Sequence, residues 1–276
     1  MFYIEKYMIT VIIHTLDEEN NIKDCINSAK LLTDKIILVD MESADKTVEV
    51  AKNLNVLVFN FPKSDYVEPA REFGIRQAKT DWIFILDADE RIIKELADEI
   101  KNVISVGNDP RVVPKKGLVG HRGPTLQYYK IPRQNIFAGI KWLRHGGWWP
   151  DYQIRLINKK YFVHWSKRIH STPEIKGQLG YLKNPLIHYF HGNLNKMVEK
   201  TIIFEDIESD LLRKAGKNVQ TSTFFRKYFA ELWRRMFKGF GFLDGSVGII
   251  ESIYQAFSKT ITYLFLYEKK LKSRSL

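Results

Sequence analysis

The segment from Thr80 to Arg91, TDWIFILDADER, constrains the fold more than any other part of the chain. Trp82 to Leu86 is a continuous run of aromatic and branched apolar residues, which predicts a strand buried on both faces. The run ends at Asp87-Ala88-Asp89. Residues two apart in an extended segment point to the same side. Both carboxylates would therefore lie where a parallel α/β sheet binds its ligands, at the carboxyl end of the strand.

Asp87 and Asp89 favour a site for a divalent cation and a diphosphate. Mg²⁺ or Mn²⁺ bridging two phosphate oxygens takes hard oxygen ligands of this kind. The alternative is a solvated acidic turn, because the D-x-D pattern is common by itself. The position at a strand end favours the metal site.

The N-terminal half of the chain alternates between strands and helices. This alternation predicts an α/β fold with a parallel, doubly wound sheet flanked by helices. Three of the strands end in acids, at Asp17, Asp40 and Asp87/Asp89, which indicates one shared crevice. A capping role for Asp17 and its neighbours stays open, since a helix start favours negative charge. Strands are expected at 8–14, 36–39, 55–59, 82–86, 128–133 and 153–157, and helices at 22–29, 50–54, 68–78 and 92–104.

A second dense stretch, IKWLRHGGWWPDYQIRLIN, begins at Ile140. Trp148 and Trp149 beside the lone acid Asp151 suggest a platform for a sugar ring with a catalytic group. A core tryptophan pair near a turn explains the same residues equally well. Four histidines follow within thirty residues, and one of them near the metal is the reasonable expectation.

The C-terminal quarter carries most of the positive charge. Residues 211–276 contain 13 Lys and Arg against 4 Asp and Glu, which accounts for +9 of the net charge of +11. The segment TFFRKYFAELWRRMFKGF, residues 223–240, has the composition of a helix lying on anionic lipid. The alternative packs its aromatic stripe on the main domain and leaves the charges outside. No signal peptide or spanning helix is expected, which suggests a cytoplasmic protein peripheral to the inner leaflet.

Several motifs taken in order resemble inverting glycosyltransferases of family 2, which have the GT-A nucleotide-sugar-binding fold. They are IIHTLDEENNI, ILVDMESADKT, the helix from Arg71 to Ala78, and FILDADER. RHGGWWPDYQIRL, the L-x-H at His188 and GFLDGSVGI extend the likeness to bacterial lipopolysaccharide-core glucosyltransferases. The resemblance implies a catalytic domain over residues 1–195 and a basic, amphipathic helical extension over residues 196–276.

The resemblance also implies a role for each matching residue. Asp87 and Asp89 would form the metal motif, with His170 as a candidate further ligand. Asp151 would be the catalytic base. Trp148 and Trp149 would contact the sugar. The nucleotide and its diphosphate would be bound by Thr15, Asp17, Glu19, Asp40 and Arg71.

The reaction expected from the resemblance is transfer of a hexose, glucose foremost, from a UDP-sugar to a hydroxyl of a glycolipid or saccharide acceptor. Mg²⁺ or Mn²⁺ would neutralise the leaving diphosphate, and a single base without an enzymic nucleophile would give inversion. A nucleotidyltransferase is one rival, although the loop after the first strand is acidic where such enzymes carry a basic, glycine-rich loop. A nucleic-acid-binding protein would explain the charge but needs a motif that is absent. No nucleic-acid partner is therefore expected.

Overall fold

The structure is a computed structural model that describes residues 9–64, 66–108, 126–169, 171–190 and 194–273. The chain divides into two compact units. The first unit comprises Met1–Arg133 and Tyr152–His188, and the second comprises Gln134–Asp151 and Tyr189–Leu276. This division differs from the expected boundary at residue 195, because residues 134–151 group with the C-terminal helices in the second unit.

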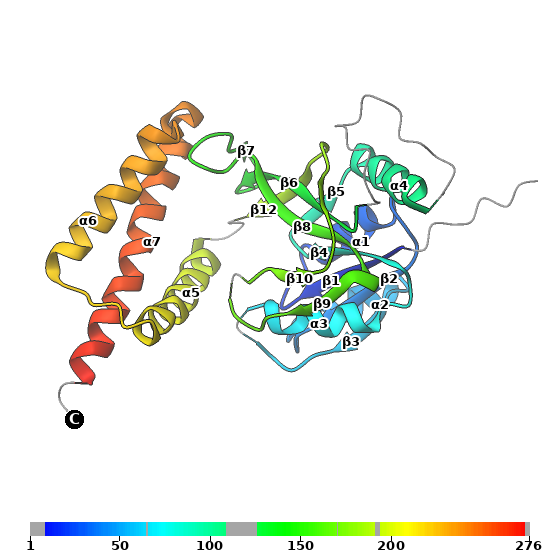
Figure 1. The fold of residues 1–276 in the computed structure, drawn as a ribbon, viewed down its shortest axis with the longest axis horizontal. Coiled ribbons are helices and arrows are strands. Elements are labelled where there is room, and N and C mark those ends of the chain that lie inside the picture. Colours follow the sequence, from blue (N-terminus) through cyan, green and yellow to red (C-terminus); the bar gives the residue numbers. More distant parts are fainter. Residues whose placement is uncertain (1–8, 65, 109–125, 170, 191–193, 274–276) are drawn as a thin grey trace, which may run out of the picture. The chain divides into compact units, whose positions relative to one another are not determined.

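The N-terminal part of the first unit is a parallel sheet in the order β3-β2-β1-β4 (Figure 1). The pairing places Thr15 beside Asp40 and His14 beside Asp87, so the acidic strand ends meet at one edge. The predicted α/β alternation is confirmed. Its elements are β1 (Ile9–Thr15), α1 (Ile22–Ala29), β2 (Ile36–Asp40), α2 (Thr47–Asn53), β3 (Leu57–Asn60), α3 (Glu68–Gln77) and β4 (Trp82–Asp87).

Beyond β4 the sheet becomes mixed and continues in the order β4-β8-β6-β12-β5. β8 runs antiparallel to β4, and β12 runs antiparallel to β5. β5 follows β4 closely in sequence but pairs at the other end of this path, so the Asp87–Glu90 turn connects two strands that are far apart only in the pairing order. The elements are β5 (Glu90–Ile92), α4 (Lys94–Asn108), β6 (Tyr128–Phe137), β7 (Lys141–Trp142), β8 (Asp151–Asn158), η1 (Lys159–Tyr161), β9 (Phe162–Trp165), β10 (Pro173–Ile175), β11 (Leu179–Tyr181) and β12 (Leu186–Phe190).

Two hydrophobic cores cover the two faces of the sheet. Alternate residues of β4 point to opposite faces, as the pleat requires. Trp82, Phe84 and Leu86 join one core, and Ile83 and Ile85 join the other. The continuous apolar run in β4 therefore reflects burial on both sides. This burial fixes the strand whose end carries Asp87.

The second unit contains the helices α5 (Leu194–Lys214), α6 (Thr221–Leu232) and α7 (Gly245–Lys272). α7 packs against both α5 and α6 (Figure 1). Val219, Tyr263 and Leu266 form a small buried cluster, with Phe224 packed against it. In the part of the chain that the structure describes, no helix has the length and apolar content needed to cross a bilayer.

The helix predicted over residues 223–240 ends differently from the expectation. Its last part widens into a π-helical turn, η2 (Trp233–Lys238), and a 3₁₀ turn, η3 (Gly241–Asp244), leads into α7. The chain changes course at Gly239, where an added Cβ would lie 3.1 Å from the Cα of Gly146. A side chain at residue 239 would therefore push these two segments apart.

Candidate active site

The loops after β1 and β2 are tied together by their own acids. Asp17 accepts a hydrogen bond from the backbone N–H of Ala44 at 2.7 Å, and its own N–H donates to the Ser43 hydroxyl at 2.9 Å. Asp40 accepts from the Ser43 hydroxyl at 2.6 Å, and Glu19 accepts from the Lys46 N–H at 3.1 Å. The three predicted nucleoside-binding acids therefore order the edge of the sheet.

Thr15 ends β1 within this edge. It is buried, and its hydroxyl has no hydrogen-bond partner among the described residues. Thr15, Asp17, Glu19 and Asp40 thus lie on adjacent strand ends, as the sequence predicted. Their contact with a nucleoside stays a prediction.

Asp87 is enclosed by two arginines. Nη2 of Arg71 lies 3.0 and 3.1 Å from its two carboxylate oxygens, and Nη2 of Arg155 lies 2.6 Å from Oδ2. The same Arg155 nitrogen donates to Glu90 at 2.5 Å. Arg71 also lies over the ring of Trp165. Arg155, from β8, was not among the predicted site residues.

Burial and these arginines have opposite effects on the pKa of Asp87. Burial alone raises that pKa, but Arg155 and then Arg71 hold it well below its usual range. The pKa of Glu90 is raised instead, because burial and the nearby Asp87 outweigh Arg155 and Arg133. His14, beside Asp87 on β1, is 3% exposed, and burial followed by the charge of Arg71 lowers its pKa to about 3.

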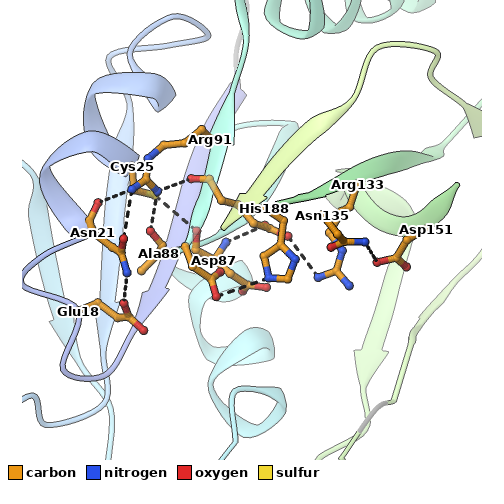
Figure 2. A network of polar contacts seen from close by, with 12 residues as sticks. Glu18, Asn21, Cys25, Asp87, Ala88, Arg91, Arg133, Asn135, Asp151 and His188 are labelled. Carbon is orange, nitrogen blue, oxygen red and sulfur yellow. Dashed lines mark hydrogen bonds and ion pairs between the residues drawn. The ribbon is translucent and has the colours of Figure 1, made fainter. Parts of the chain in front are cut away.

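Asp89 has a different environment from Asp87. Its Oδ2 lies 3.5 Å from Nε2 of His188, and the two side chains are 23% and 14% exposed. β12 brings His188 there by pairing with Glu90 of β5. Figure 2 shows the His188 ring close to Asp87. Carboxylate and imidazole are both metal ligands. The described residues contain no group of three or more His, Cys, Asp or Glu side chains suited to a metal ion.

The histidine predicted as a metal ligand is His170, which lies outside the described residues. Because His188 is about a hundred residues from Asp89 in sequence, only the pairing of β5 with β12 identifies it as the histidine next to this acid. The sequence signal available was the L-x-H pattern, Leu186 to His188.

The turn after β4 is held by Arg91 and closed by Cys25. Arg91 donates to the carbonyl oxygens of Ala88 and Glu90 at 2.8 and 2.9 Å, and to that of Asn21 at 3.1 Å (Figure 2). Cys25 is buried with its Sγ 3.5 Å from the carbonyl oxygen of Asp87. Burial raises the pKa of this thiol well above its usual value, so Cys25 is a packing residue.

Asp151 belongs to the second unit and is oriented by a neighbour in β6. The side-chain amide of Asn135 donates to Asp151 Oδ2 at 3.2 Å and to the carbonyl oxygen of Trp148 at 3.0 Å. Trp148 stacks on Phe190 with ring centroids 4.7 Å apart. Trp149 meets Trp142 edge to face. Both predicted sugar-contacting rings are therefore half-buried against other aromatic rings.

A buried acid of the second unit, Asp244, anchors the loop that precedes Asp151. Its Oδ2 accepts from the backbone N–H groups of Arg144 and His145 at 2.9 and 2.8 Å, and its Oδ1 lies 2.9 Å from Nδ1 of His145. The Gly146 N–H donates to Gly239 at 2.7 Å. The sequence shows GFLDGSVGI only as a resemblance to lipopolysaccharide-core glucosyltransferases, and it predicts no role for Asp244.

The family model described as glycosyl transferase family 2 matches residues 10–162, more than half of the chain. The chain belongs to this family. The match runs from β1 through β8, so it includes the acids at the strand ends and Arg155 but not His188. The predicted family is thereby confirmed, and this family 2 chain is an enzyme, so the non-enzymatic and nucleotidyltransferase alternatives are wrong.

Relatives of this family 2 protein match it along nearly its full length. A glycosyltransferase of Rickettsia bellii is 31% identical and one of Rickettsia typhi is 30% identical, each over 97% of this chain and covering 87% and 89% of the relative. The lipopolysaccharide core biosynthesis glycosyltransferase LpsC of Rhizobium meliloti is 23% identical over 98% of this chain and 96% of its own. The crystal structure of S. aureus TarS 1–349 in complex with UDP-GlcNAc gives a TM-score of 0.44 at 14% identity, over 90% of this chain and 79% of that one.

Proposed function

We propose that this family 2 enzyme transfers a hexose, glucose foremost, from a UDP-sugar to a hydroxyl of a glycolipid acceptor such as lipopolysaccharide core, with inversion. The observation that carries the proposal is the pairing of Asp89 with His188 beside an Asp87 already neutralised by arginines. The full-length relative LpsC, named for lipopolysaccharide core biosynthesis, supports the choice of acceptor.

Asp89 and His188 are the side chains that would hold Mg²⁺ or Mn²⁺. The Asp89 carboxylate suits this role, because magnesium sites commonly combine one or two carboxylates with substrate phosphate oxygens, and His188 would add a nitrogen ligand. The bound ion would neutralise charge on the departing diphosphate. Asp87 would contribute differently from the expectation. Its carboxylate holds Arg71 and Arg155 in place, and Arg71 would face the nucleotide diphosphate from there.

Asp151 would accept the proton of the acceptor hydroxyl. Asn135 donates a hydrogen bond to Oδ2 of this carboxylate and so orients the acid. A single base accepting a proton as the hydroxyl attacks gives direct displacement and inverted stereochemistry. Trp148 and Trp149 would form the wall next to this acid on the side where the acceptor binds.

The place of action proposed here is the cytoplasmic face of the inner membrane. UDP-sugars are cytosolic and a glycolipid acceptor is membrane-borne, so the enzyme would work as a peripheral protein. The basic C-terminal helices would carry this contact.

Turnover of UDP-glucose and other UDP-sugars, measured as UDP release with Mn²⁺, tests the chemistry. Asp89→Ala should abolish turnover, and a chelator should do the same to the wild type. Asp151→Asn should lower kcat by about 10²–10⁴-fold and preserve donor binding in a thermal-shift assay. Asp98→Ala, an exposed acid on α4, is the matched control and should be fully active. Normal transfer by Asp89→Ala would refute the metal assignment. Loss of donor binding by Asp151→Asn would show that Asp151 takes part in donor binding instead of accepting the proton.

A further inference from the structure

α6 and η2 present their aromatic side chains outward. Phe225, Phe229, Trp233 and Phe237 are 64%, 61%, 62% and 51% exposed. They recur every four residues and form one line along the helix, which we call the aromatic row. Phe224, one residue before the row, instead packs against the cluster of Val219, Tyr263 and Leu266. The stripe predicted from the sequence therefore divides into an inward part and an outward part.

A row of exposed basic side chains lies beside the aromatic row. Arg226, Arg234 and Lys238 each follow an aromatic-row residue by one position. The predicted lipid-facing segment, residues 223–240, also contains Lys227 and Arg235, but these two side chains turn inward. Lys227 lies over the ring of Tyr263, and Arg235 donates to the carbonyl oxygen of Gly146 and lies over Trp148. The outward basic surface thus consists of fewer residues than the sequence predicted.

Exposed apolar side chains continue from the aromatic row into the turn and the start of α7. Phe240, Phe242 and Leu243 are exposed in the turn, and Ile250, Ile253 and Phe257 are exposed on α7. The second unit therefore exposes many large apolar side chains, and exposed apolar clusters are typical of interaction surfaces.

We infer that the aromatic row, flanked by Arg226, Arg234 and Lys238, is the surface that docks on an anionic lipid bilayer. The inference rests on the proposed membrane-borne acceptor. Aromatic rings insert at the headgroup boundary while Lys and Arg remain at the lipid phosphates, which is the arrangement of interfacial helices. Charge complementarity selects the occupant, because +9 of the net charge lies in residues 211–276. A nucleic acid would use the same charges but would leave this length of aromatic surface in water.

Co-sedimentation with phosphatidylglycerol-containing vesicles tests the assignment on the full chain. Wild type should bind these vesicles, release them as salt rises, and bind pure phosphatidylcholine vesicles weakly. Trp233→Ser should weaken binding about tenfold, as expected for one large aromatic ring leaving an apolar phase. Arg226→Gln and Lys238→Gln should each weaken it about fivefold. Leu57→Ser is the matched control, since Leu57 is 59% exposed on β3 in the first unit, and it should bind as wild type does.

A fluorescence measurement keeps the test valid if a serine variant folds poorly. Vesicles with brominated acyl chains should quench part of the wild-type tryptophan emission, and Trp233→Phe should remove that quenched part while retaining binding. Each variant should keep wild-type UDP-sugar binding in solution, which separates this inference from the proposed chemistry. The inference is wrong if wild type ignores anionic vesicles, if Leu57→Ser loses as much binding as Trp233→Ser, or if wild type is a dimer that Trp233→Ser converts to a monomer.

Discussion

His14 connects the electrostatics of the strand-end site to the stability of the fold. Burial and Arg71 lower its pKa from 6.5 to about 3. Between these two pH values the unfolded chain binds a proton that the folded chain excludes, so the free energy of unfolding rises with pH. The stabilisation is fully present above the unfolded pKa of 6.5 and is lost as the pH falls toward 3.

The size of the effect follows from the two pKa values. Their difference, 6.5 minus 3, corresponds to roughly 5 kcal/mol over the whole window at 1.36 kcal/mol per pKa unit. Between pH 7 and pH 5 the contribution of His14 falls by about 2 kcal/mol, because the unfolded histidine becomes almost fully protonated while the folded one does not. His14→Leu removes the titrating group.

Urea unfolding followed by circular dichroism at pH 7 and pH 5, with chelator present, measures this contribution. The loss of stability between the two pH values should be about 2 kcal/mol smaller in His14→Leu than in wild type. His164→Leu, at an exposed position on β9, is the matched substitution of a histidine outside the site. If wild type and His14→Leu lose the same free energy of unfolding between pH 7 and pH 5, His14 takes up its proton in the folded state as readily as in the unfolded chain.

Two further substitutions test buried charges in the two units. Arg155→Met leaves Asp87 and Glu90 without their shared partner and should lower the free energy of unfolding by about 3–5 kcal/mol. The deficit measured by urea unfolding should shrink at acid pH, because Glu90 has a raised pKa and takes up a proton more readily in the folded state; a deficit that grows on acidification would contradict this account. Asp244→Ala removes three hydrogen bonds to the loop before Asp151 and should lower stability by about 2–4 kcal/mol and kcat by at least tenfold, with donor binding unchanged. Unchanged kcat in Asp244→Ala would show that the loop holds its conformation without this anchor.

The long elements of the fold could be predicted from the sequence because each has a local cause. The apolar run of β4 is long enough to identify a buried strand, and the acid after it marks the strand end. Helix α1 likewise shows its buried face in Ile22, Cys25, Ile26 and Ala29. The acids placed at the shared crevice follow from these strands, since parallel strands end at the same edge.

The remaining features depend on pairing between distant segments. Six of the strands, β5, β7 and β9–β12, have only two to five residues each. Segments this short do not show a hydrophobic period that would identify them as strands. The neighbour of Asp89 is His188 only because β5 pairs with β12. Asp244 meets Arg144 across a separation of 100 residues. The apolar spacing in α6 shows that its aromatic side chains form a row, but it does not show that the row faces outward while Phe224 faces inward.

The second unit is built from two separate stretches of the chain, and this limits which segments can be exchanged with relatives in a chimera. A chimera made with one crossover near residue 195 would separate Asp244 from the backbone it holds at Arg144 and His145. A graft that keeps this anchor must carry residues 134–151 together with residues 189–276. Such a graft exchanges Asp151 and the helices proposed to dock on lipid in one step and leaves the arginines around Asp87 untouched. Acceptor choice and donor choice would then be inherited separately.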